Sequence, residues 1–219
     1  LLMHGMFKAN LFLSAGSVMH GMNDQKNMRL YGALRVALKV TMVAFICGFL
    51  GISGLPPFDS WFSKDGIIDA ALGVNLFAGI CALAVAGMTA FYMTRMLAMT
   101  FFGDERWEEG THPHESPPVM TIPMLILGVG ALFGGLFFVY VAPIEDWLAP
   151  VTGFEAAHPP IPEIPLKLLS IAIALAGIGV GWYMYAMRPV PRTAPQDVSV
   201  LTTAGRHSLY GDALNESLF

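Results

Sequence analysis

Charged side chains are scarce in this sequence. Asp, Glu, Lys and Arg together make up 13% of the residues, while hydrophobic residues make up 55%. About 25% of the residues in a typical soluble domain are charged, so the composition excludes an ordinary soluble domain and indicates a membrane protein. The formal net charge is −4 and no basic stripe is present, so we do not expect nucleic acid as a partner.

Cysteine and the familiar catalytic motifs are also lacking. The two cysteines, Cys47 and Cys81, have no metal-ligand spacing, and we interpret them as buried small hydrophobic residues rather than a disulfide or a cluster site. His112 and His114 lie among glutamates in a short proline-rich stretch that favours a solvated loop over a metal site. The sequence contains no phosphate-binding loop, dinucleotide fingerprint or nucleophile elbow, so covalent catalysis and a cofactor in this chain have no support.

Long stretches without charge are what the sequence does contain. Four such windows have about the 20 residues that a helix needs to cross a bilayer. A fifth, between Lys8 and Asp24, reaches that length only if Lys8 lies within the membrane. The windows predict an all-α membrane protein with about five spanning helices. The predicted helices lie near 1–22, 39–72, 74–102, 118–142 and 166–187.

The second predicted helix is interrupted. Gly54, Pro56 and Pro57 follow an apolar run and precede another helical stretch. A membrane helix that stops and restarts leaves backbone groups without partners, which is tolerated only where protein or a water-filled cavity surrounds them. We expect Asp59 or Ser60 to cap the amides of the second half.

Lys64 and Asp65 stand just after this break. The positive end of the half-helix dipole and the loss of water both disfavour an ammonium at Lys64, which favours exchange of its proton, whereas Asp65 acts in the opposite sense as a counter-charge. Adjacent residues point about 100° apart on a helix, so the two need not face the same neighbours. Proton handling is the favoured interpretation, because ionisable groups inside a membrane mark pathways. A structural ion pair that staples the break is the alternative.

A second ionisable pair lies on the first predicted helix. His4 and Lys8 are four residues apart and therefore share a helical face. Because Lys8 must count toward the span, we interpret the pair as part of the same pathway. The alternative is that Lys8 lies near a helix end and extends its amine to the membrane surface.

The loops predict how the helices are oriented. Lysine and arginine occur in the connections 23–39 and 103–117 and in the tail after Met187, whereas the connections 73–75 and 143–165 have none. The positive-inside bias therefore puts the first set in the cytoplasm. Small residues four apart predict close packing between helices. They are Ala82, Ala86 and Ala90, then Gly130 and Gly134, and finally Gly177 and Gly181.

The segments HGMFKANLFLSAGSVMHG and GISGLPPFDSWFSKDGI carry a family resemblance. A His-x-x-x-Lys helix, a basic connector and a glycine–proline break that leads to Phe-Ser-Lys-Asp resemble the antiporter-like L subunits (chain 5) of respiratory complex I, the proton-pumping NADH:quinone oxidoreductase. The resemblance covers nearly the whole chain, as the C-terminal part of such a subunit, and is strongest over 1–71. It implies that Lys8 and His4 form the central relay of a proton path and that Lys64 with Asp65 forms its exit end.

The resemblance also implies partners and location. The chain would be a translocase subunit in the cell inner (plasma) membrane, in contact with lipid, protons, water and other membrane-arm subunits. FMN, iron–sulfur clusters, NADH and quinone would belong to partner subunits. Residues 1–102 would hold the helices of the second half-channel, 103–187 two further membrane helices with their loops, and 188–219 a polar cytoplasmic tail leading to a missing element. The chain opens with Leu1 directly in a helix, which indicates a piece of a longer polypeptide.

Two other functions stay open at this point. The large subunits of Mrp-type sodium/proton antiporters and the membrane arms of related hydrogenases resemble this chain in the same break and lysines. A different class of function is a non-conducting scaffold, whose buried ion pairs are inert and which only anchors partner subunits.

Overall fold

The chain folds into helices joined by turns and loops of varied length. The computed structural model describes residues 1–152, 162–196 and 198–218, and over these ranges it contains no strand. The long helices are α1 (Leu2–Gly21), α2 (Lys39–Ser53), α3 (Asp59–Val74), α4 (Leu76–Phe101), α5 (Pro118–Leu136) and α7 (Glu163–Tyr185). The short ones are η1 (Met28–Leu30), the π-helical turn η2 (Phe137–Val141), α6 (Ile144–Thr152), α8 (Val200–Arg206), η3 (Ser208–Tyr210) and α9 (Gly211–Leu218). The all-α fold class is confirmed.

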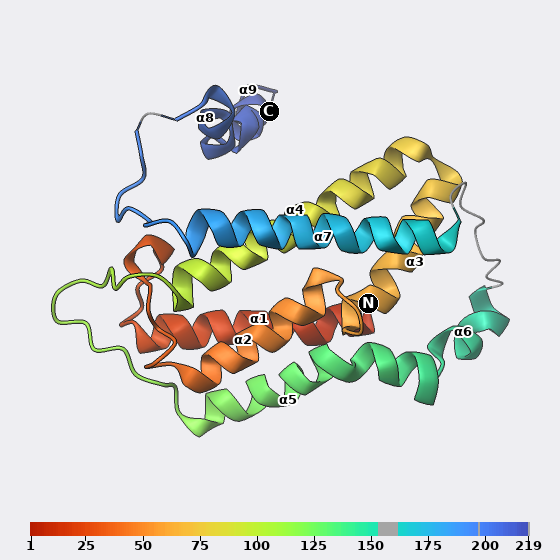
Figure 1. Ribbon diagram of the computed structural model, residues 1–219, viewed down its shortest axis with the longest axis horizontal. Coiled ribbons are helices and arrows are strands. Elements are labelled where there is room, and N and C mark those ends of the chain that lie inside the picture. Colours follow the sequence, from red (N-terminus) through yellow and green to blue (C-terminus); the bar gives the residue numbers. More distant parts are fainter. Residues whose placement is uncertain (153–161, 197, 219) are drawn as a thin grey trace.

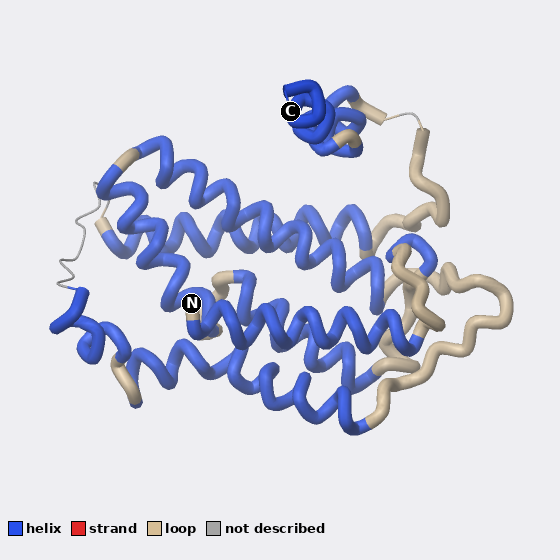
Figure 2. Tube along the Cα trace, turned by 180° about the vertical axis from the view of Figure 1, so that it is seen from behind, coloured by secondary structure: helices blue, strands red, loops and turns tan. Residues whose placement is uncertain are grey.

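The long helices form two groups, which are joined by α3 and by direct packing of α2 against α4. α1 packs against α2 and α5, while α7 packs along α4 (Figure 1). α3 contacts members of both groups, namely α2 and α5 on one side and α4 and α7 on the other. Seen from behind, α8 and α9 lie apart from the bundle (Figure 2). The short helix α6 was not predicted within 143–165, and residues 153–161 of that connection lie outside the described residues.

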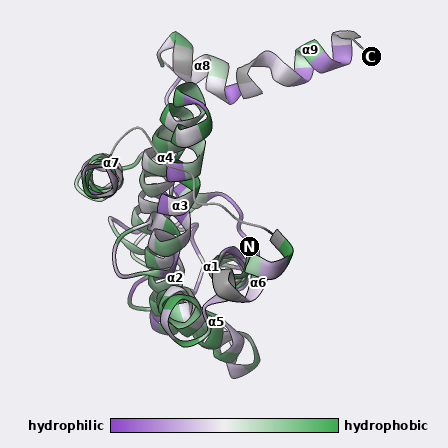
Figure 3. Ribbon diagram, turned by 90° about the vertical axis from the view of Figure 1, so that its right-hand side faces the viewer, coloured by the Kyte–Doolittle hydropathy of each residue, from purple (hydrophilic) through white to green (hydrophobic). Residues whose placement is uncertain are grey.

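Among the described residues, three helical segments are long and apolar enough to cross a membrane: Leu76–Phe101, Pro118–Val141 and Ile164–Tyr185. Their outward faces carry exposed apolar side chains, and much of the ribbon of these helices has the colour of hydrophobic residues in Figure 3. On α5 these include Ile122, Ile126, Val129 and Phe133. Such a face fits lipid. Helices form at all five predicted places, and the protein is a multi-pass membrane protein. A count of five spans is not confirmed, since α2 is a shorter apolar helix.

The predicted break in the second helix is present. α2 ends at Ser53, and Gly54 follows in the left-handed conformation, with φ 78°. Glycine adopts this conformation without the steric cost that a Cβ brings, and it is the usual residue after a helix end. After Leu55 come Pro56 and Pro57, neither of which can donate a backbone hydrogen bond. The chain resumes as a helix at Asp59.

The predicted cap of α3 is wrong. Phe58 occupies the N-cap position, and no side chain caps the helix. Asp59 is fully buried and turns toward α5 instead. A Cβ added at Gly134 would lie 3.1 Å from Asp59 Oδ1, and one at Gly135 would lie 3.0 Å from Asp59 Cα. The two glycines therefore let α5 close over the start of α3.

The amides at the start of α2 are satisfied from a distant part of the chain. Glu115 Oε2 accepts hydrogen bonds from Val40 N (2.7 Å) and Thr41 N (3.3 Å). Its Oε1 accepts one from Thr41 Oγ1 (2.5 Å). A carboxylate in this position meets both the free amides and the positive end of the helix dipole.

The connection 103–117 is more than the solvated loop that was predicted. Arg106 is 5% exposed, and it donates hydrogen bonds to the carbonyl oxygens of Met99 (2.7 Å) and Arg29 (2.9 Å). Burial lowers the pKa of the Arg106 guanidinium from its ordinary value. This arginine joins the 103–117 connection to the end of α4 and to η1.

The small residues of α4 and α7 pack as predicted. A Cβ added at Gly177 would lie 2.4 Å from the Gly87 carbonyl oxygen and 3.3 Å from Ala90 Cβ. At Gly181 it would lie 3.0 Å from the Phe91 carbonyl oxygen. The backbones of the two helices therefore approach closely, which only small residues allow.

The prediction of two buried cysteines is wrong for Cys81. Both cysteines are free, with Cys47 partly buried and Cys81 exposed. Cys81 lies four residues from Phe77 and Val85, which are exposed as well. It therefore belongs to the outward apolar face of α4.

Candidate proton-relay site

Lys64 occupies the break between α2 and α3. Its Nζ donates a hydrogen bond of 2.9 Å to the carbonyl oxygen of Ile52, in the last turn of α2. A Cβ added at Gly54 would lie 3.2 Å from Lys64 Cδ and 3.4 Å from Nζ. The last carbonyls of a helix have no partner within the helix. The amine thus meets a carbonyl that the interrupted helix leaves free.

Asp65 points to a different helix. Its Oδ1 accepts a hydrogen bond of 3.0 Å from Ser170 Oγ on α7. Asp65 is 6% exposed and Ser170 4% exposed, while Asp65 Oδ2 has no hydrogen-bond partner among the described residues. Lys64 turns to α2 and Asp65 to α7, as adjacent positions on a helix require.

Two further charges surround Asp65. Lys167 on α7 and Asp69 on α3 lie close enough to the Asp65 carboxylate for their charges to act on it. Lys167 Nζ is also 5.8 Å from the centre of the Trp61 ring. Lys167 was not predicted as a site residue. Two spacings could have indicated it: Asp65 and Asp69 are four residues apart, and Lys167 and Ser170 are three residues apart, so each pair shares a helical face.

The predicted pair on α1 is held less firmly. Lys8 is partly buried and His4 is exposed. The His4 ring contacts the Phe7 ring at 5.1 Å between centroids, and neither the His4 nor the Lys8 side chain forms a hydrogen bond with the described part of the chain. The structure therefore places Lys64 against α2 and Asp65 against α7 at the break, and it leaves His4 and Lys8 on α1 as a separate pair.

The buried side of α1 carries a row of polar residues that was not predicted. Asn10, Ser14 and Ser17 are fully buried and share one face of the helix. Asn10 Nδ2 donates to the Met124 carbonyl oxygen (2.7 Å). Asn10 Oδ1 and Ser14 Oγ have no hydrogen-bond partner among the described residues. An unpaired polar group costs free energy in an apolar interior, so these atoms are places where water would be stabilised.

The end of this row joins the cap of α2. Ser17 Oγ is 2.6 Å from Thr41 Oγ1 and donates to Ser116 Oγ at 2.7 Å. Thr41 in turn donates to Glu115. Polar groups thus continue from the interior of the α1–α2–α5 interface to the loop end of the bundle.

Asp59 is a third ionisable residue at the break. Both of its carboxylate oxygens are buried without a hydrogen-bond partner among the described residues. The Gly135 backbone lies close to Asp59 but forms no hydrogen bond with its carboxylate. An isolated carboxylate in such a place is costly. Asp59 was not predicted as a buried ionisable residue, because its position after the break favoured a helix cap.

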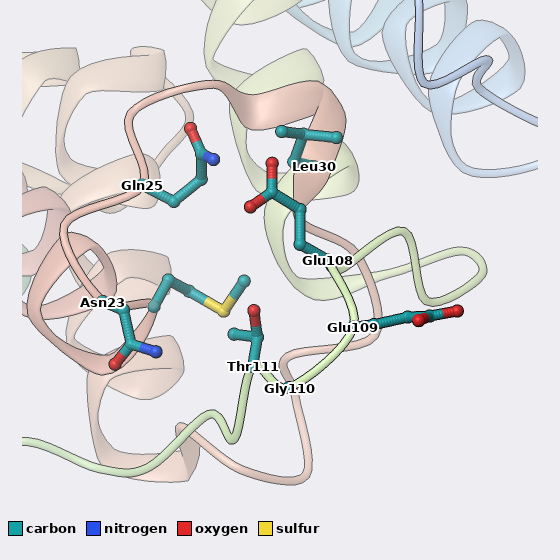
Figure 4. A pocket seen from close by; sticks show the side chains of 8 residues that line it. Asn23, Gln25, Leu30, Glu108, Glu109, Gly110 and Thr111 are labelled. Carbon is teal, nitrogen blue, oxygen red and sulfur yellow. The ribbon is translucent and has the colours of Figure 1, made fainter.

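A separate hollow lies at the loop end of the bundle (Figure 4). Its walls come from the 22–30 connection and from 108–111, and Glu108 and Glu109 lie on one side of it. Across the described ranges, no three His, Cys, Asp or Glu side chains are placed to hold a metal ion. None of the predicted relay residues lines the hollow, so the candidate site is the region around the break.

Comparison with known proteins first identifies the class. Residues 1–90 match the family described as "NADH:quinone oxidoreductase/Mrp antiporter, TM". The matched range runs from α1 through the break and into α4. Together with the all-helical fold, the match defines an antiporter-like membrane segment.

Individual relatives narrow the class. The NADH-quinone oxidoreductase subunit L of Mycobacterium tuberculosis is 49% identical over 100% of this chain and 35% of its own length. Chain 5 of the NAD(P)H-quinone oxidoreductase of Picosynechococcus is 35% identical over 100% of this chain and 38% of its own length. The chain belongs to this L-type family, which confirms the resemblance, and it spans about a third of the length of these relatives.

Proposed function

We propose that this chain is part of the proton-translocating membrane subunit of an NADH:quinone oxidoreductase. It conducts protons through buried lysine and histidine side chains and water, driven by redox chemistry in other subunits. The observation that carries this proposal is Lys64, whose amine lies in a broken helix. The L-type relatives support the assignment to that complex.

Lys64 is suited to exchange a proton. Its only hydrogen bond within the described residues goes to the Ile52 carbonyl oxygen, which accepts equally from an ammonium or from a neutral amine. Loss of water disfavours the ammonium, while the adjacent Asp65 favours it. A second positive charge that approaches from the relay therefore shifts the balance toward release of the proton.

Lys8 and His4 supply the central relay in this proposal. Since no hydrogen bond joins them to the described residues around the break, water must carry the proton between them and Lys64. The unpaired polar atoms of Asn10 and Ser14 on the same helix provide partners for such water. The redox groups FMN, iron–sulfur clusters, NADH and quinone belong to partner subunits.

The location follows from the same proposal. The chain lies in the cell inner (plasma) membrane beside other membrane-arm subunits. The connections 23–39 and 103–117 and the C-terminal tail face the cytoplasm, because they carry the lysines and arginines. Residues 1–102 hold the second half-channel, and 103–187 provide the helices that enclose it.

The test uses Lys64→Ala and Lys8→Ala in the intact complex. We expect NADH-driven proton translocation to fall to a small fraction of the wild-type value in each variant. Reduction of a soluble acceptor by NADH should continue, since the redox groups lie elsewhere. Lys39→Ala is the matched control, because Lys39 is exposed at the start of α2. Unchanged translocation in both test variants would contradict the assignment.

The family match also favours a second candidate, because its description includes Mrp antiporters. In that case the same lysines would exchange sodium for protons without a redox partner. Purification of the native assembly separates the two functions: copurifying NADH-oxidising subunits support the first, and sodium-dependent proton exchange in their absence supports the second.

A non-conducting scaffold is the remaining alternative. The hydrogen bond from Lys64 to Ile52 would then serve only to hold the break together. A continuous file of water between Lys8 and Lys64 in the full complex supports transport, whereas apolar packing between them supports the scaffold.

A further inference from the structure

A cluster of charges joins α3 to α7 beyond the proposed relay. We call Asp65, Asp69, Lys167 and Ser170 the α3–α7 cluster. Asp65 and Asp69 are four residues apart on α3, and Lys167 and Ser170 are three apart on α7, so each pair shares a helical face. The Ser170–Asp65 hydrogen bond of 3.0 Å fixes the two faces against each other.

The centre of the cluster is shielded from solvent. Asp65 and Ser170 are both more than nine-tenths buried. Asp65 Oδ2 has no hydrogen-bond partner among the described residues, and the same is true of the buried Nε1 of Trp61. The Trp61 ring faces the Lys167 ammonium at 5.8 Å. Charges interact strongly in such surroundings, because little water screens them.

The cluster lies between the break and the turn that joins α3 to α4. Lys64 stands near the start of α3, Asp69 is one turn further along, and the helix ends at Val74. Lys167 is in the first turns of α7, and the starts of α7 and α4 lie near the same end of the bundle (Figure 1). Ionisable groups therefore continue from the break toward the 73–75 end.

We propose that Lys167 is a further proton-carrying residue, which passes protons from Lys64, by way of Asp65, to water at the 73–75 end of the bundle. This inference rests on the proposed function. It assigns Lys167 a role in transfer, with Asp69 as the fixed counter-charge that remains when Asp65 is protonated.

The transfer consists of three balanced steps. The Lys64 ammonium gives its proton to the Asp65 carboxylate through bridging water, which leaves a neutral amine and a carboxylic acid. Loss of the Asp65 negative charge weakens the hold on the Lys167 proton, and the Lys167 ammonium releases it to water. The Asp65 acid then protonates the Lys167 amine, so that the ion pair is restored and one proton has moved outward.

A purely structural ion pair is the competing explanation, and arginine separates the two. Arginine keeps the positive charge and the contacts with carboxylates and aromatic rings, but it does not release its proton. A structural role is therefore preserved in Lys167→Arg, whereas a proton carrier is lost.

The experiment compares Lys167→Arg, Lys64→Arg and the control Lys39→Arg in the intact complex. Protons translocated per NADH oxidised are measured in reconstituted vesicles, so that the ratio does not depend on how much complex assembles. We expect Lys167→Arg to lose most of the translocation that Lys64→Arg loses, while Lys39→Arg matches the wild type. Lys167→His should restore part of the loss, because histidine can release a proton.

The outcomes distinguish the inference from the proposed function. If Lys64→Arg abolishes translocation and Lys167→Arg retains it, Lys167 is a structural partner and the inference is wrong, while the proposed function stands. If both arginine variants translocate normally, the proposed function itself fails. Loss in Lys167→Arg without any recovery in Lys167→His also overturns the role of Lys167 as a carrier.

Discussion

Two helix interfaces in this molecule pack in different ways. α4 and α7 meet through small residues, with Gly177 against the Gly87 backbone and Ala90. In the α1–α2–α5 interface glycines also allow close approach, but buried polar side chains lie there among the apolar ones. Asn10 packs against Gly48, since a Cβ added at Gly48 would lie 2.4 Å from Asn10 Oδ1. That oxygen has no hydrogen-bond partner among the described residues.

The difference is whether the buried polar groups have hydrogen-bond partners. In the α4–α7 interface the buried hydroxyl of Thr94 donates to the Ala90 carbonyl oxygen at 2.7 Å, so its polar group is satisfied. In the α1–α2–α5 interface and at the neighbouring start of α3, Asn10, Ser14 and Asp59 keep buried polar atoms without partners in the described part of the chain. Such atoms are costly in a membrane, which favours the proposed conducting role of this region over a purely structural one. The following changes test this contrast.

The largest effect is expected in the close-packed interface. Gly177→Leu puts a side chain where even a Cβ would lie 2.4 Å from the Gly87 carbonyl oxygen. Overpacking of this kind costs about 1–3 kcal/mol or more, and the backbone of α4 cannot move aside as a side chain could. We expect little assembled subunit and a lower melting temperature of what assembles.

A matched control lies two residues away. A Cβ on Gly179 meets no atom within 4 Å, so Gly179→Leu should assemble normally. Native gels measure how much subunit assembles, and thermal scans give its melting temperature. If the two leucine variants agree in both quantities, α4 and α7 do not pack closely in the membrane.

A smaller effect is expected at the loop end of the polar interface. Glu115→Ala removes the acceptor of the Val40 and Thr41 amides. Loss of a helix cap costs about 0.5–2 kcal/mol, so the melting temperature should fall modestly. Glu109→Ala is the control, since Glu109 is exposed and should change nothing. If Glu115→Ala and Glu109→Ala have the same melting temperature, the cap of α2 does not stabilise the protein.

The sequence predicts the helices of this fold well, because each follows from a local pattern. A stretch without charge specifies a membrane helix by length alone, and Gly54 with its prolines specifies where one is interrupted. The small residues of α4 and α7 were also identified as packing faces from their spacing. All of these features depend on residues close together in the chain.

What could not be predicted depends on distant partners. Asp59 looks like a helix cap in the sequence, but the approach of α5 buries it. Glu115 caps a helix that begins 76 residues earlier, at Lys39, and Asp65 meets Ser170 at a separation of 105 residues. No periodicity in the sequence indicates such pairs. The candidate site was therefore predicted at Lys64 and Asp65, but its partners Lys167 and Ser170 on α7 were not.

The smallest effect on stability is expected from Asp59→Asn. The amide has nearly the shape of the carboxyl group but carries no charge, and the carboxyl oxygens have no hydrogen-bond partner in the described part of the chain. Removing a buried carboxyl that lacks partners should leave the melting temperature unchanged or raise it slightly. Asp24→Asn, at an exposed position, gives the baseline. A decrease of more than about 2 kcal/mol in the free energy of unfolding would show that Asp59 has an ionic partner in the assembled protein. The buried polar groups near the break would then be satisfied, as Thr94 is in the α4–α7 interface.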